Sequence, residues 1–202
     1  MQGYLRVVNM VYWLGIVLWA AALVTAAAAA LNVFPAVDGA AVTLAQYAAY
    51  PAEEHGRLLA GRIMEAVLCC VDVLQFIAVP LTAGALVAQL AIFGVPIRRA
   101  SNVIRTGCVV IGALVFSYHA TMLAPRMNRE LRSYWAAAEA GEVAQAHVHR
   151  AAFDRYHPRA EALMRVNLFL VLVAVASSAV AFGTGRAEAG PRLELPNLAG
   201  ES

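Results

Sequence analysis

The stretch Ile63–Phe93 constrains this chain more than any other, because it is a run of 31 predominantly apolar residues. As a helix rising 1.5 Å per residue it is about 46 Å long, whereas the hydrocarbon core of a bilayer is roughly 30 Å thick. Such a helix can cross a membrane and project beyond it. Two carboxylates, Glu65 and Asp72, lie near its start. An acidic group inside a membrane is a hypothesis for a functional site.

Helical spacing places these acids on one side of that helix. Glu65, Cys69, Asp72 and Phe76 follow the spacing i, i+4, i+7, i+11 and form a stripe about 60° wide. Two interpretations remain open for the stripe. If the bilayer covers the first part of the run, the acids are intramembrane groups. If it covers only the later part, Asp72 lies near the interface and Glu65 lies in water.

Composition supports the membrane class. The chain is 61% hydrophobic and 14% charged, against about 25% charged residues in a typical soluble domain. It contains 15 arginines and no lysine, with a net charge of +2 and no dense basic run. Nucleic acid is therefore not an expected partner. Its three cysteines lie in apolar segments and form no disulfide framework, so they are interpreted as small buried apolar residues or as soft metal ligands.

The apolar segments predict an all-α integral membrane protein, a four-transmembrane-helix bundle over residues 1–185 with a flexible tail at 186–202. The expected spans lie near residues 8–33, 62–93, 103–124 and 160–182. Pro51 is expected to open the helix that leads into the second span, Pro125 to stop the third span, and Pro158 to restart the helix of the fourth. A cleaved signal peptide is the competing interpretation of the alanine-rich first segment.

The connectors carry the remaining secondary-structure predictions. Leu131, Tyr134, Trp135 and Ala138 share one face of the polar third connector, which predicts an amphipathic interfacial helix within residues 127–140. That helix lies on the membrane surface or packs against the bundle. Gly141 is expected to end it. In the first connector, residues 40–49 are expected to form a short interfacial helix.

Four spans place the first and third connectors on one side of the membrane, and the termini with the 94–102 loop on the other. Polar residues then gather in the half of the membrane nearest the long connectors: Glu65, Cys69, Asp72, Tyr118, His119, His157 and Asn167. A bend before Pro158 is expected to turn His157 over this group. Two interpretations stay open, a functional site or hydrogen bonds that only join helices. The opposite half offers few polar groups: Asn9, Gln89, Arg105, Ser177 and Ser178.

Three short motifs give the chain a resemblance to a known family. They are Phe153-Asp154-Arg155-Tyr156-His157-Pro158 followed by Asn167, the segment Glu54–Arg62 at the entrance of the second span, and Ala124-Pro125-Arg126-Met127 after the third. In these features the chain resembles the transmembrane protein 205-like family over roughly residues 10–182. The resemblance implies a four-helix integral membrane domain of largely unassigned role. The alanine-rich first span and the Glu65/Asp72 pair depart from that pattern.

The sequence contains no HExxH, Walker, GxSxG or zinc-spaced cysteine motif, so no enzyme class is indicated. The expected function is that of a small transporter or a membrane-complex subunit with a polar site in one leaflet. Its expected partners are the bilayer and either a second copy or another membrane protein. The alternative is a metal- or haem-handling bundle that uses His119 with Cys69, His55 or His157. Arginines in the 97–105 loop predict cytoplasmic termini. The expected location is the inner membrane of a bacterium.

Overall fold

The computed structural model describes residues 2–38, 40 and 42–187, and within these ranges it is helical with short connections and no strand. Four continuous helical units are long and apolar enough to cross a membrane: Gly3–Asp38, Ala52–Ile92, Ala100–Glu139 and Val143–Ala181. The all-helical class with four such units is therefore confirmed. Each unit has 36 to 41 residues, which corresponds to about 54 Å or more and exceeds the thickness of a bilayer core.

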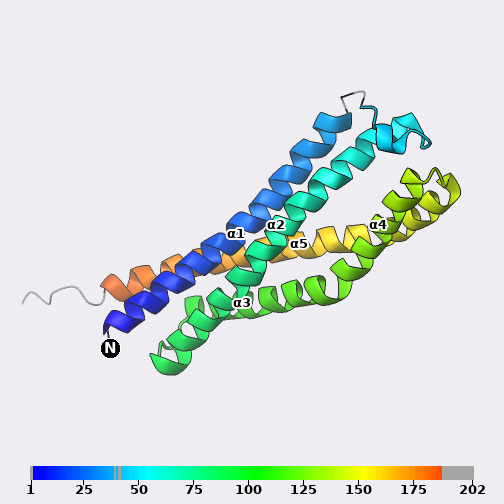
Figure 1. Ribbon diagram of the computed structural model, residues 1–202. Coiled ribbons are helices and arrows are strands. Elements are labelled where there is room, and N and C mark those ends of the chain that lie inside the picture. The colour runs from blue at the N-terminus through cyan, green and yellow to red at the C-terminus, as the bar shows by residue number, and fades with distance from the viewer. Residues whose placement is uncertain (1, 39, 41, 188–202) are drawn as a thin grey trace, which may run out of the picture.

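Each unit is built from one or more regular elements (Figure 1). The first is α1, Gln2–Asp38. The second comprises a 3₁₀ turn η2 (Ala52–Glu54), α2 (His55–Val87) and a π-helical turn η3 (Ala88–Ile92). The third comprises α3 (Ala100–Tyr118), a π-helical turn η4 (His119–Leu123) and α4 (Ala124–Glu139). The fourth is α5, Val143–Ala187.

Prolines end fewer helices than the sequence suggested. The expected stop at Pro125 is wrong, because the third unit continues through η4 into α4, with Pro125 in the first turn of α4. The expected break at Pro158 is also wrong, since α5 continues through it. A proline removes one helical hydrogen bond and leaves a carbonyl oxygen one turn earlier without its donor. In α5 that position is Asp154, which is exposed to solvent together with Pro158.

Glycines mark the ends that were predicted correctly. Gly94 follows η3 with φ 62°, and Gly141 follows α4 with φ 74°. Both are left-handed conformations that glycine adopts without steric strain. The expected helix over 40–49 is wrong, because this segment contains only the 3₁₀ turn η1, Ala45–Tyr47. Most of the predicted tail lies outside the described residues, although residues 186 and 187 form the last part of α5.

The units pack as two antiparallel pairs. α1 packs along α2, while α5 packs along both α3 and α4 (Figure 1). The N-terminus, the α2–α3 connection and the last turns of α5 share what we call the terminal end. The described part of the first connection, residues 42–51, and the connection at 140–142 share the opposite, connector end. This is the alternating topology that four spans predict.

The main core joins all four units. It is formed by stripes of buried residues at helical spacing, including Tyr12, Ile16, Trp19, Leu86, Val109, Phe116 and Val171. Many large apolar side chains on the outer faces are nevertheless exposed, among them Met10, Leu14, Ile77, Ile111, Leu114 and Phe169. A soluble monomer rarely leaves so extensive an apolar surface in water, whereas lipid covers it at no cost.

A second cluster closes the connector end. Tyr134, Trp135 and Ala138 of α4 are buried there against Tyr47 and Leu58. These α4 residues belong to the apolar face that the sequence predicted, so the amphipathic helix is confirmed within residues 124–139. Its apolar face packs against the protein rather than against a membrane surface. A Cβ atom at Gly61 would lie 3.5 Å from the Trp135 ring, which shows that the Trp135 side chain reaches from α4 to the surface of α2.

Candidate functional site

The predicted stripe on α2 faces the third helical unit along a line that we call the α2–α4 seam. Three pairs define it. Glu65 Oε1 lies 3.4 Å from Arg132 Nε, Asp72 lies close enough to His119 for their charges to interact, and the Phe76 and Phe116 rings meet edge to face at 5.1 Å. As the position on α2 increases, the partner's position decreases, as antiparallel helices require. The seam is polar toward the connector end and aromatic toward the core.

Asp72 and His119 form the chemically most capable pair of the seam. Both side chains are half-buried. His119 Nδ1 is buried and has no hydrogen-bond partner among the described residues. His119 also begins the π-helical turn η4, and π-helical turns within helices are frequent at functional sites. A carboxylate beside an imidazole can hold a proton and pass it on, because an imidazole ordinarily gains and loses its proton near neutral pH and a carboxylate can accept that proton.

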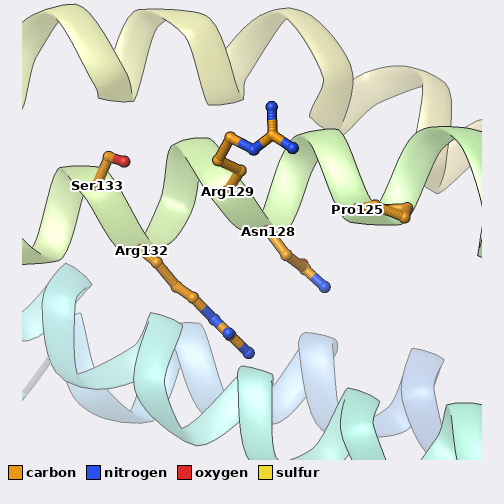
Figure 2. Close-up of a pocket in the computed structure, with 5 residues that line it drawn as sticks. All are labelled: Pro125, Asn128, Arg129, Arg132 and Ser133. Atoms are coloured by element: carbon orange, nitrogen blue, oxygen red, sulfur yellow. The ribbon is translucent and has the colours of Figure 1, made fainter.

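An open surface hollow of about 480 Å³ lies along α4, lined by Pro125, Asn128, Arg129, Arg132 and Ser133 (Figure 2). Asn128 and Arg132 point from α4 toward α2, whereas Arg129 points toward α5. The α2 side of the hollow is thus polar and carries one of its two guanidinium groups. This group, on Arg132, meets Glu65, although the arginine is largely exposed and the pair is screened by water.

Three of the seven predicted site residues, Glu65, Asp72 and His119, make the contacts of this seam, and four do not. Cys69 lies on the α2 stripe between Glu65 and Asp72 and is exposed. Tyr118 is adjacent to His119 in sequence but is exposed. His157 is exposed on the unbroken helix α5 and stacks on Phe153 of the same helix at 5.2 Å. Because no break turns it back, the expectation that His157 lies over the group is wrong.

Asn167 is buried in the core rather than in the seam. A Cβ atom at Gly112 would lie 3.0 Å from Asn167 Oδ1 and 3.1 Å from the Trp19 ring. Asn167 therefore fills the space that a glycine leaves between α3, α5 and α1. Asn167 Oδ1 is buried and has no hydrogen-bond partner among the described residues, so this contact is one of close packing.

His55 has a structural role at the connector end. Its Nδ1 accepts a hydrogen bond from the Leu44 backbone N–H at 3.0 Å, so Nε2 carries the proton and donates to Tyr47 O at 2.9 Å. Both ring nitrogens are occupied, which leaves none for a metal ion. No group of three His, Cys, Asp or Glu side chains that could hold a metal occurs within the part of the chain that the structure describes.

A second group of polar side chains lies at the terminal end, and the sequence did not predict that its members contact one another. Tyr12 Oη and Ser178 Oγ are hydrogen-bonded at 2.8 Å, and the Arg105 guanidinium lies 5.1 Å from the Tyr12 ring centroid. Arg105 is only 1% exposed. Its assignment to a membrane-flanking loop is therefore wrong. The sequence could have predicted this burial. Arg105, Gln89 and Ser178 each lie three or four residues from a core position, on the same helix face.

Comparison with known proteins identifies no relative. No family model, no curated protein and no solved structure matches this chain.

Proposed function

We propose that this chain is an integral membrane protein of the bacterial inner membrane and acts as a small proton-handling transporter or as the corresponding subunit of a membrane complex. The observation that carries the proposal is the Asp72–His119 pair, which lies on the seam between two apolar helical units. Titratable groups in such positions serve proton transfer more readily than stability, since an intramembrane charge is expensive to keep.

The membrane assignment draws on two features. Four units have the length and hydropathy of membrane spans, and apolar side chains cover their outer faces. For orientation, the exposed arginines at the terminal end, Arg6, Arg98 and Arg99, favour cytoplasmic termini by the positive-inside rule. The buried Arg105 is not needed for this orientation, because the three exposed arginines favour cytoplasmic termini without it. The partner expected beside the lipid remains a second copy or another membrane protein.

The seam offers a route as well as a proton site. Its connector end lies beside Arg132 and Glu65, and Asp72 and His119 lie further along the same line. Beyond them the Phe76–Phe116 contact and the main core separate the seam from the terminal end. Proton movement along this route requires the core contact to open transiently. The kinship with transmembrane protein 205-like proteins is a further part of this proposal, based on the three motifs.

Proton flux into liposomes tests the function. Purified protein is reconstituted with a pH-sensitive dye inside, and a potassium diffusion potential drives protons inward. We expect wild-type liposomes to acidify faster than empty ones and Asp72→Asn to return the rate to that of empty liposomes. Glu161→Gln is the matched control, because it removes a carboxylate from the exposed Glu161–Arg165 pair. Equal rates for wild-type and empty liposomes, or for wild type and Asp72→Asn, would contradict the proposal.

A further inference from the structure

Helix register places three amide side chains at one depth near the terminal end. α1 and α2 run antiparallel, and Gly15 meets Thr82, where a Cβ atom on the glycine would lie 2.6 Å from Thr82 Oγ1. Two helical turns from this contact, toward the terminal end, lead to positions 8–9 on α1 and to Gln89 on the second unit. Asn9 and Gln89 are therefore at the same level. The packing of η3 against α1 agrees with this register.

The third helix adds another amide to the same level. α1 and α3 run in the same direction, and two contacts fix their offset: Tyr12 with Arg105, and Trp19 with Gly112. Each pair differs by 93 in residue number, so Asn102 lies at the level of Asn9. We call Asn9, Gln89 and Asn102 the amide layer. It lies one turn closer to the terminal end than Tyr12 and Arg105.

Gln89 and Asn102 of the amide layer are buried and Asn9 is half-buried, yet four of the layer's polar side-chain atoms have no partner among the described residues. Gln89 is 1% exposed, and neither its Oε1 nor its Nε2 has a partner there. Asn102 is 4% exposed. Its Nδ2 donates to Pro96 O at 2.8 Å, which fixes the orientation of the amide and leaves Oδ1 as a buried acceptor. Asn9 Oδ1 is likewise buried and unpartnered.

The three unpartnered oxygens at this level are acceptors, so a ligand that satisfies them must donate hydrogen bonds. A cation is disfavoured, because the Arg105 guanidinium carries a positive charge one turn deeper. Water is the smallest donor, can also accept from Gln89 Nε2, and brings no charge. Buried waters typically make about three hydrogen bonds to polar groups that lack other partners. The amide layer provides four such atoms.

We propose that the amide layer is a binding site for ordered water within the bundle, on the opposite side of the main core from the α2–α4 seam. The α2–α3 connection covers it, since Pro96 O accepts from Asn102 and the Val95 N–H donates to Gln89 O at 3.1 Å. This site goes beyond the proposed proton function and does not depend on it. Asp72 and Gln89 are 17 residues apart, about 25 Å along the helix.

Water-edited solid-state NMR on the full chain in liposomes tests the site. Magnetisation is transferred from water to ¹⁵N-labelled side-chain amides, and the Gln89 signal is assigned by its loss in Gln89→Met. We expect the Gln89 and Asn102 amides to receive magnetisation as early as exposed amides do. The proposal would be overturned if magnetisation from water reached both amides as slowly as it reaches the apolar core.

Two variants show whether the waters are shared. Gln89→Met removes one wall of the layer and should slow the transfer to Asn102 several-fold. Gln75→Met is the matched control, because Gln75 is a buried glutamine of the same helical unit but lies four turns away from Gln89. It should leave Asn102 unchanged. If Gln89→Met does not purify, Asn9→Leu makes the same test from α1. If neither variant of the layer changes the magnetisation transfer from water to Asn102, the shared site is contradicted. This result does not depend on whether the protein conducts protons.

Discussion

The guanidinium carbon of Arg62 lies 4.1 Å from the centroid of the Trp135 ring and joins α2 to α4 at the connector end. The same arginine donates to Tyr47 Oη at 3.2 Å, so one side chain contacts the first connector and the amphipathic helix together. An arginine over a tryptophan face is stabilised by the ring quadrupole. The connector end is consequently a packed layer and not a set of loose loops.

Trp135→Ala should destabilise the protein by about 3–5 kcal/mol, because a fully buried aromatic side chain is removed and leaves a cavity. Thermal unfolding in detergent, followed by circular dichroism, measures the effect. Trp135→Phe should recover part of the loss, since it restores most of the ring volume. If the Trp135→Ala protein unfolds at the same temperature as wild type, the packing of α4 on α2 is contradicted.

His55→Leu should cost about 2 kcal/mol or more, because the Leu44 N–H and the Tyr47 carbonyl lose their partners in a buried position. The unfolding midpoint measures it. His147, which lies near the start of α5 and is exposed, supplies the control variant His147→Leu. Equal midpoints for the two variants would mean that His55 does not organise the connector end.

Gly15→Ala should destabilise the α1–α2 pair, because the added methyl group would lie 2.6 Å from Thr82 Oγ1 and 3.0 Å from Thr82 N. Gly84 is also inside a helix but has no neighbouring atom within 4 Å of a Cβ position. Gly84→Ala should therefore raise stability by roughly 0.5–1 kcal/mol through helix propensity. Melting curves of the two variants should move in opposite directions. A shift of both in the same direction would contradict the close helix contact.

Arg150→Gln should cost more stability than Arg132→Gln. The Arg150–Glu54 pair is hydrogen-bonded at 2.8 Å with side chains 22% and 24% exposed, whereas the Arg132–Glu65 pair is 3.4 Å apart and 73% and 32% exposed. We expect about 1 kcal/mol or more for Arg150 and about 0.5 kcal/mol or less for Arg132. Unfolding in detergent at two salt concentrations compares them. The reverse order would mean that the seam contributes more to stability than the connector end does.

Hydrophobic periodicity was sufficient to predict the helical units and their topology. Apolar runs longer than a bilayer thickness have few alternatives to helix, and alternating directions follow from short connections. The stripe of Glu65, Asp72 and Phe76 was predicted for the same reason, because helical spacing depends only on residue number. Prolines were misleading at Pro125 and Pro158. A proline's local preference can be overridden when the neighbouring turns are held by packing and the lost hydrogen bond lies at a solvated face.

The sequence by itself determined that four apolar helices form, which residues share a face of each, and that carboxylates and a histidine lie near the connector side. Only the tertiary structure decided which faces meet. It brought Asp72 within charge-interaction range of His119, left His157 exposed, placed Asn167 against Gly112, and enclosed Arg105 and Gln89 near the terminal end. The physical reason is that spacing along a helix is fixed by backbone geometry, whereas the rotation and offset between helices depend on side-chain volumes at every contact.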